Sequence, residues 1–173
     1  MNKNKILIGT DTISGIAPEL LKAISDASKT KTPPYGNDIF TKECKKIVRS
    51  IFEKKDLEIL PMMSGTASNC LGLSSFLRSY GSVICHVDSH INRDEGGAPE
   101  FFSGGGKLLS ISNSSGRLKG KDILEKVEEI NFKGKLNTFI SGVSITQLAE
   151  NGTLYTLDEI NEISKVCKKK KLY

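Results

Sequence analysis

Short apolar runs that alternate with two-faced helical segments are the feature that most constrains the fold of this chain. The runs that indicate strands are residues 57–60, 82–86, 107–111 and 138–145. Each is followed by a stretch that is wholly or partly helical in its apolar spacing. Repeated strand–helix units of this length are typical of a parallel sheet covered by helices. We therefore expect an α/β fold with a mostly parallel sheet and flanking helices.

The helical segments differ in how clearly the sequence marks them. The most regular apolar spacing is at residues 39–54, and further helices are expected at about 66–80, at 121–130 and partly at 88–98. The last helix opens at Thr156, and Glu159 three residues later completes the pattern of a capping box. Residues 171–173 then look like the start of another strand.

The amino-terminal part is expected to carry one arm and one helix. Residues 5–9 indicate a short strand or an extended arm. A helix is expected behind Pro18, since proline is common in the first helical turn. Its apolar residues Leu20, Leu21 and Ile24 are expected to face inward.

The composition is that of a soluble globular protein, with 38% hydrophobic and 26% charged residues in a chain of 173. No apolar run reaches the roughly 18 residues that a membrane span needs. The start of the chain lacks the pattern of a signal peptide. We therefore expect a cytoplasmic protein without a membrane partner.

The net charge of +5 does not indicate a nucleic-acid surface. Residues 168–171 are all lysine and contribute four of the five charges, so the excess lies at one place. A nucleic-acid footprint would instead spread basic residues along a face. We interpret the lysines as a solvated helix end, where the helix dipole favours cations. No nucleic-acid partner is expected.

Neither the cysteines nor the histidines indicate a metal site or a disulfide framework. The four cysteines stand far apart and form no CxxC pair. His86 and His90 are spaced i, i+4, but His86 falls at the end of a predicted strand. The geometry of a helical zinc site therefore fails, and no metal is expected.

The turn Ser64-Gly65-Thr66 is the first candidate site. It follows a predicted strand and opens a predicted helix, where backbone N–H groups are left without partners. These groups and the helix dipole favour a bound anion. Serine, glycine and threonine are also ordinary residues at a helix start. From the residues alone, a plain helix cap and an anion site both remain open.

The second candidate site is the stretch from Cys85 to Ala98, which contains His90 and several acids. It follows a predicted strand, at the sheet edge where open α/β proteins bind ligands. His90 could be an ordinary hydrogen-bonded histidine or a ring that stacks on a planar cofactor. The sequence has no GxGxxG, no phosphate loop and no GxSxG, which argues against nucleotide binding and against a serine hydrolase.

A series of ordered motifs runs nearly from one end of the chain to the other. They are Thr10-Asp11-Thr12, Pro34-Tyr35-Gly36-Asn37-Asp38, Ser64-Gly65-Thr66-Ala67-Ser68-Asn69, residues 85–105, Ser144-Ile145-Thr146-Gln147 and Glu150-Asn151-Gly152-Thr153-Leu154-Tyr155. In these motifs and their spacing the chain resembles the amino-terminal half of the low-specificity L-threonine aldolases. These are pyridoxal-phosphate enzymes of the beta-eliminating lyase group with the aspartate-aminotransferase fold.

The resemblance implies a domain organisation. Residues 1–30 would form an amino-terminal arm and helix, and residues 31–173 the first part of the large domain that binds pyridoxal phosphate. In the family, an Asp-Gly-Ala-Arg strand and the lysine that bonds to the cofactor follow this part. The chain is therefore expected to be an incomplete large domain that is inactive alone. The full-length protein would form a homodimer or homotetramer.

The resemblance also implies site residues. Gly65 and Thr66 would hold the cofactor phosphate, and His90 would stack on the pyridine ring and act near the substrate hydroxyl. Thr10, at a position where the family usually has serine, would contact the substrate carboxylate.

Tyr35 and Glu95 match positions at the rim of the site and are expected to bind substrate. The implied reaction of the full-length protein is the cleavage of L-threonine or L-allo-threonine to glycine and acetaldehyde. Other pyridoxal-phosphate chemistry, such as β-elimination or transamination, and a non-catalytic fragment are the alternatives.

Overall fold

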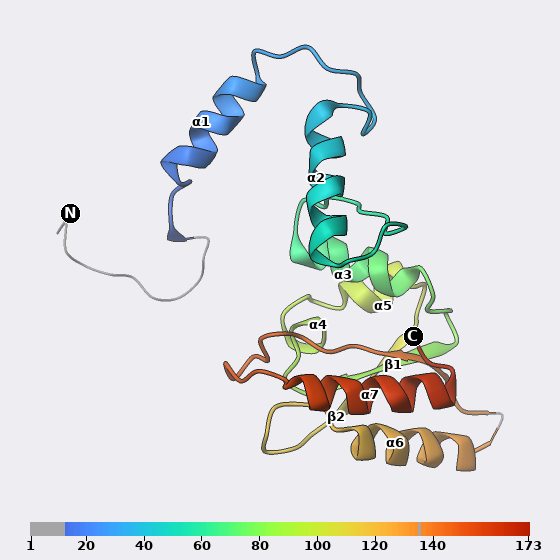
Figure 1. The fold of residues 1–173 in the computed structure, drawn as a ribbon. Helices are drawn as coiled ribbons and strands as arrows, with labels where there is room; N and C mark the ends of the chain where they lie inside the picture. Colours follow the sequence, from blue (N-terminus) through green and yellow to red (C-terminus); the bar gives the residue numbers. More distant parts are fainter. Residues whose placement is uncertain (1–12, 135) are drawn as a thin grey trace. The chain divides into compact units, whose positions relative to one another are not determined.

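The computed structural model describes residues 13–134 and 136–173 (Figure 1). Contacts divide the chain into two compact units, residues 1–60 and 61–173. This division lies further along the chain than the predicted boundary between residues 30 and 31. The predicted boundary refers to the large domain of the family and stays a prediction. The predicted strand or arm at 5–9 lies outside the described residues. Among the described residues, no helix combines the length and apolar character needed to cross a membrane.

The first unit contains two helices among its described residues, α1 (Pro18–Ala27) and α2 (Ile39–Ile51). Asp38 caps α2, since its carboxylate accepts a hydrogen bond from the Thr41 N–H at 2.7 Å. The helix ends three residues before the predicted position 54, and Glu53 just beyond it adopts a left-handed φ of 52°. Both helices were predicted from spacing and are confirmed.

The prediction that the apolar residues of α1 face inward is wrong for the described residues. Leu20, Leu21 and Ile24 are each more than half exposed, and none of the described residues of α1 or α2 is buried. Apolar spacing predicts a helix because it describes a stripe along one side of it. It does not by itself supply the surface that the stripe covers.

The predicted strand at 57–60 is also wrong, because these residues form a loop. The backbone of this loop is bound by a side chain and not by a neighbouring strand. Arg49 on α2 donates from its Nε to the Leu57 carbonyl at 2.8 Å. Glu58 pairs with the same arginine and with Lys45, each at 3.3 Å. Polar side chains thus bind a segment whose apolar residues had predicted a strand.

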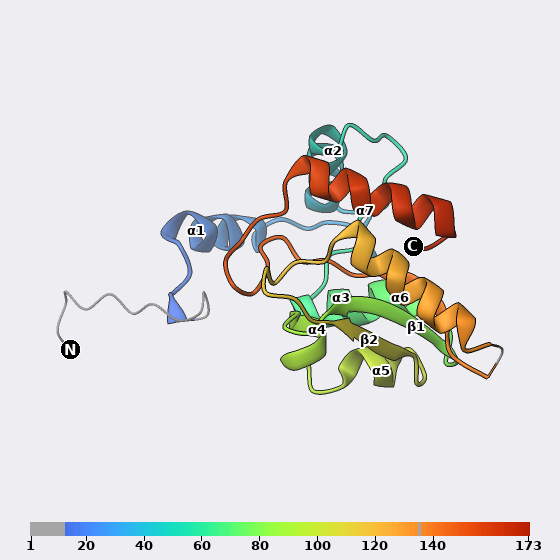
Figure 2. The same cartoon turned by 90° about the horizontal axis from the view of Figure 1, so that it is seen from below.

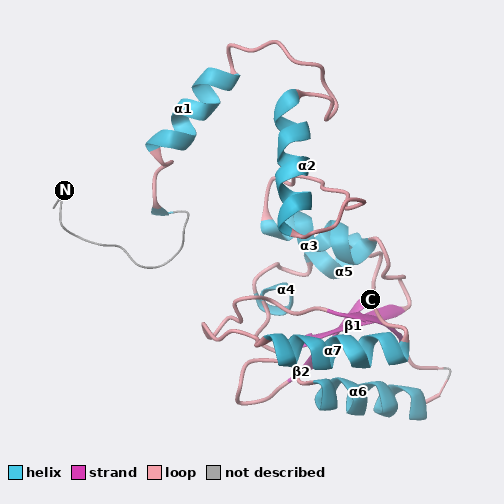
Figure 3. Cartoon of the chain, viewed as in Figure 1, coloured by secondary structure: helices cyan, strands magenta, loops and turns pink. Residues whose placement is uncertain are grey.

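The second unit is built on a parallel sheet, as predicted. Among the described residues the sheet has three strands in the order β2–β1–β3, which are β1 (Gly81–His86), β2 (Lys107–Ile111) and β3 (Phe139–Val143). Figure 3 shows the labelled strands in magenta among the helices. Every residue of β1 is buried because this strand is central. The predicted strands at 82–86, 107–111 and 138–145 are confirmed, with small shifts at their ends.

Helices cover the two faces of the sheet (Figure 2). On one face lie α6 (Gly120–Phe132) and α7 (Leu157–Lys170), side by side and packed over Ile84. On the other face, Val83 and Cys85 pack with residues of α3 (Gly65–Ser74) and its following loop and with Ile91. Successive residues of β1 therefore point to opposite faces, which is the ordinary alternation of a strand.

One helix prediction on the α3 face needs correction, because α3 ends at Ser74 and not near residue 80. The hydroxyls of Ser74 and Ser75 donate to carbonyl groups three residues earlier in the chain, which competes with further helical bonding. The prediction that residues 88–98 are partly helical is confirmed by α4 (His90–Arg93), and a further short helix, α5 (Ala98–Phe102), was not predicted.

The predicted capping box of α7 is confirmed. The Thr156 hydroxyl accepts from the Glu159 N–H at 3.2 Å, and the Glu159 carboxylate accepts from the Thr156 N–H at 2.7 Å. At the far end, Tyr173 makes two backbone hydrogen bonds with β3, one to the Ser141 carbonyl at 3.0 Å and one from the Val143 N–H at 2.9 Å. Residues 171–173 thus contact the sheet, although no strand is formed there.

Candidate active site

His90 forms a hydrogen-bonded pair with a buried carboxylate at the carboxyl end of the sheet. It is the first residue of α4, in the loop that follows β1. Its Nδ1 lies 3.0 Å from Oε1 of Glu95, whose side chain is fully buried, whereas that of His90 is 45% exposed. The same Oε1 accepts a hydrogen bond from Asn69 Nδ2 at 2.7 Å. One oxygen of Glu95 therefore binds both residues.

This arrangement gives the imidazole a defined polarity. A carboxylate accepts hydrogen bonds, so the ring nitrogen that faces Glu95 is the one that carries the proton. In the neutral ring the other nitrogen, Nε2, is then an acceptor. Because the His90 side chain is nearly half exposed, its Nε2 can receive a proton from a ligand. The pair has the chemistry of a general base.

The start of α3 has the features expected of an anion site. Ser64 caps the helix, since its hydroxyl accepts the Ala67 N–H at 3.1 Å. The N–H groups of Gly65 and Thr66 have no hydrogen-bond partner among the described residues. Apart from the adjacent residues and the backbone of α3 itself, no described atom lies within 4 Å of the position where a Cβ on Gly65 would be, so the space beside this turn is open. The two interpretations left open by the sequence, cap and anion site, are compatible.

Asn69 connects the start of α3 with His90. It lies on α3 about one turn after Gly65, and its amide holds the carboxylate that in turn holds the imidazole. No role was predicted for this residue. The available signal was a polar side chain directly before the apolar Cys70 and Leu71 in a predicted helix, and a half-buried amide usually has a hydrogen-bond partner.

The structure does not test the roles of the three other predicted site residues. Thr10 lies outside the described residues. Tyr35 belongs to the first unit, where its side chain is almost fully exposed and its backbone adopts a left-handed φ of 61°. Glu95 lies behind His90, where it is buried. The roles in substrate binding of all three residues stay predictions.

The cysteines of the second unit do not have the environment of reactive thiols. Burial, together with the charge of Glu95, raises the pKa of Cys70. Burial also raises the pKa of Cys85 and of Cys167. A thiol with a raised pKa carries little of the nucleophilic thiolate at neutral pH. These cysteines therefore serve as small apolar residues.

Comparison with known proteins gives strong matches in sequence. The family model "Beta-eliminating lyase" matches residues 8–173. A low specificity L-threonine aldolase of Pseudomonas aeruginosa is 39% identical over 163 residues, which are 92% of this chain and 45% of that protein. The enzyme of the same name from a Pseudomonas species is 40% identical over the same shares. The chain thus spans about 45% of the length of these curated relatives.

Solved structures agree with this match. A threonine aldolase of Leishmania major superposes with a TM-score of 0.86 at 28% identity, covering 92% of this chain and 46% of that one. An archaeal alanine:glyoxylate aminotransferase superposes with a TM-score of 0.61 at 19% identity, which indicates a shared fold alone. The predicted fold, part of an aspartate-aminotransferase-like large domain, is confirmed. From its sequence and its fold, the chain belongs to the beta-eliminating lyase family, whose members depend on pyridoxal phosphate.

Proposed function

We propose that the whole protein is an aldehyde-lyase that cleaves L-threonine and L-allo-threonine to glycine and acetaldehyde with pyridoxal phosphate. The observation that carries the proposal is the His90–Glu95 pair, at 3.0 Å, on a scaffold that also contains a helix start with two N–H groups that no described residue binds. The names of the relatives in Pseudomonas and Leishmania support the same activity.

The residues of this chain fit the proposed cofactor. The Gly65 and Thr66 N–H groups would hold its phosphate, because a helix start favours a bound anion. The half-exposed ring of His90 would stack on its pyridine ring. When bound, pyridoxal phosphate supplies an electron sink that makes cleavage of the Cα–Cβ bond possible.

His90 is proposed as the base of the reaction. Its Nδ1–H is held by Glu95, so Nε2 would accept the proton of the substrate β-hydroxyl as the Cα–Cβ bond breaks. A positioned general base contributes about 10²–10⁴-fold to a rate. The same nitrogen could later return the proton to the glycine product.

Glu95 and Asn69 are proposed as positioning residues that act through His90. The buried carboxylate keeps the imidazole in one tautomer and orientation, and Asn69 holds the carboxylate in turn. A direct contact between Glu95 and substrate, implied by the resemblance, stays a prediction. So do contacts of the substrate with Thr10 and Tyr35.

Further aspects of the whole protein follow from the resemblance and are proposals in the same sense. The lysine that bonds to the cofactor and the aspartate that pairs with its ring nitrogen are expected in a segment beyond Tyr173. We therefore expect the 173-residue chain alone to release no acetaldehyde. For the whole protein we propose a cytoplasmic homodimer or homotetramer that forms glycine.

The proposal is tested by measuring the products that the whole protein forms from L-threonine and L-allo-threonine. Equal amounts of acetaldehyde and glycine are expected. A 2-oxo acid with ammonia would indicate β-elimination, and amino transfer to a 2-oxo acid would indicate transamination; either result would overturn the proposal. Cofactor binding is measured separately by absorbance and fluorescence. Thr66→Pro, which removes one of the two free N–H groups, should weaken it.

A further inference from the structure

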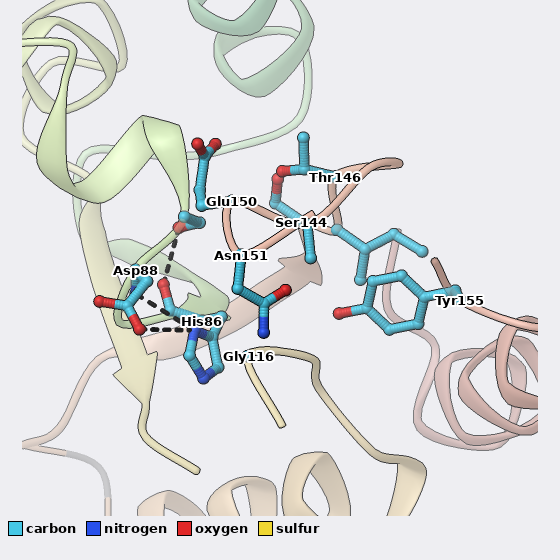
Figure 4. A pocket seen from close by; sticks show the side chains of 11 residues that line it. His86, Asp88, Gly116, Ser144, Thr146, Glu150, Asn151 and Tyr155 are labelled. Carbon is cyan, nitrogen blue, oxygen red and sulfur yellow. Dashed lines mark hydrogen bonds and ion pairs between the residues drawn. The ribbon is translucent and has the colours of Figure 1, made fainter. Parts of the chain in front are cut away.

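A small cavity lies at the carboxyl end of the sheet, and its lining does not include His90, Glu95 or Asn69 (Figure 4). Its lining includes His86, Gly116, Ser144, Asn151 and Tyr155, and its volume is about 30 Å³. Since Ile84 packs under α6 and α7, His86 two residues later points to the same face of the sheet. The cavity therefore belongs to the α6/α7 face, whereas His90 is bound through Glu95 to α3.

His86 lines this cavity and carries a buried donor that has no partner among the described residues. The Asp88 N–H donates to its Nδ1 at 3.2 Å, so in the neutral ring the proton is on Nε2. If the ring is protonated, Nε2 also carries a hydrogen, and Asp88 Oδ2 lies 3.7 Å from Nδ1. In both states Nε2–H is a donor. It is buried and has no hydrogen-bond partner among the described residues.

Tyr155 brings a second donor to the same cavity. Its hydroxyl oxygen accepts the Leu118 N–H at 2.7 Å. Burial raises the pKa of Tyr155, so the hydroxyl keeps its proton at neutral pH. No acceptor for that proton is found among the described residues. Figure 4 shows the hydroxyl directed toward the side of the cavity where Asn151 and His86 lie.

We propose that this cavity holds one or two ordered water molecules that accept hydrogen bonds from His86 Nε2–H and Tyr155 Oη–H. A volume of about 30 Å³ is enough for one or two waters, and a buried water needs two to four polar partners. Ordered water is the ligand that satisfies two buried donors without adding charge. The cavity is lined by polar residues on several sides, unlike the apolar cavities that stay empty.

The water site would connect separate segments of the chain. His86 ends β1, and its carbonyl accepts both the N–H and the hydroxyl of Ser89, at 3.0 and 2.7 Å. Tyr155 lies before α7, where the two ends of the Gln147 side-chain amide bind its backbone N–H and carbonyl. Water between His86 and Tyr155 therefore joins the loop after β1 to the segment before α7. This inference does not depend on the proposed reaction.

The decisive experiment is a crystal structure of the protein at a resolution that shows ordered water. We expect density within about 2.7–3.2 Å of His86 Nε2 and of Tyr155 Oη. An empty cavity, or a protein group bonded to His86 Nε2, would overturn the proposal. Nitrogen-15 NMR of His86 provides a second test, in which a protonated Nε2 is expected. A neutral ring with its proton on Nδ1 would contradict the argument.

Two matched substitutions at residue 86 separate the role of Nε2 from that of Nδ1. In His86→Gln the amide reaches the position of Nε2 and can still donate to water. His86→Asn keeps an acceptor for the Asp88 N–H but places no donor in the cavity. Water should persist in the first variant and lose occupancy in the second, and also in Tyr155→Phe. Unchanged occupancy in both His86→Asn and Tyr155→Phe would overturn the assignment, even if His86→Gln fails to fold.

Discussion

The regions around the two histidines of this chain differ, although only three residues separate them. His90 is nearly half exposed, and its inner nitrogen is bound to the buried carboxylate of Glu95. His86 is buried on the α6/α7 face of the sheet, and its Nε2 is bound to no described residue. One ring presents an acceptor to a ligand and the other presents a donor to a cavity. Their difference shows that burial and partners decide what a histidine can do.

The first prediction tests the His90 side and has the largest expected effect. In the whole protein, His90→Asn should lower kcat for L-threonine by about 10²–10⁴-fold, since the amide cannot accept a proton in place of the base. Acetaldehyde release is the measurement, taken at a cofactor concentration that saturates the variant, because loss of the stacked ring should weaken cofactor binding. Glu125→Gln on the exposed side of α6 is the control and should leave the rate unchanged. A rate for His90→Asn within a few-fold of the natural one would contradict the role as base.

The second prediction concerns the support of His90. Glu95→Gln removes a charge-assisted hydrogen bond worth about 1.5–3 kcal/mol, which corresponds to a loss of roughly 10-fold or more in kcat. The value of KM should change less, because the carboxylate is buried behind the imidazole. A change in KM alone would favour direct substrate binding by Glu95. Asn69→Ala should lower kcat in the same direction but less, because Glu95 keeps its bond to His90.

The third prediction concerns Tyr155, which lines the same cavity as His86, and is tested by the stability of the protein. Tyr155→Phe leaves the buried Leu118 N–H without an acceptor, which costs about 1–3 kcal/mol of the free energy of unfolding. Urea unfolding followed by circular dichroism is the measurement. Tyr80→Phe is the matched control, since Tyr80 is 70% exposed. Equal stability of the two variants would show that the hydrogen bond between Leu118 and the Tyr155 hydroxyl does not stabilise the protein.

The fourth prediction has the smallest effect and provides a baseline for both regions. Lys126 and Lys133 hydrogen-bond Glu129 on α6 and lower the pKa of its carboxyl from 4.5 to about 2. A folded pKa below the unfolded one means that the stabilisation is present above pH 4.5 and is lost as the pH falls toward 2. Glu129→Gln should therefore flatten the loss of stability over this range, weakly because the residue is exposed, and less at high salt. A change in stability at neutral pH that exceeds the change in this acidic range would contradict the assignment to Glu129.

Much of the second unit could be predicted from the sequence, and the reasons are local. The capping box at Thr156 needs only two residues of the same turn, and it forms as predicted. The strands at 82–86 and 107–111 are short apolar runs between turn residues, and both pair in parallel. Local patterns were wrong where a distant group intervened. The run at 57–60 is a loop because the Arg49 side chain binds its backbone.

The site was predicted in part. The turn with Gly65 and Thr66 and the stretch with His90 were candidates because they lie at a helix start and after a strand, and the roles that the resemblance implies for them stay predictions. Asn69 was missed because its partner, Glu95, lies 26 residues away in the sequence. Nothing in the local pattern distinguished the Glu95 carboxylate, which is buried, from the other acids of the 85–98 stretch.

The sequence by itself determined the α/β alternation, the helix start at Ser64 and the position of His90 beyond a strand. These features depend on interactions between residues that are close in the sequence, and the order of apolar and polar side chains therefore predicts them. Only the tertiary structure decided that His90 rests on a buried carboxylate held from α3, and that His86 faces a cavity on the other side of the sheet. Those outcomes depend on alternation along β1 and on contacts between distant segments, which set burial, hydrogen-bond partners and therefore the chemistry of each ring.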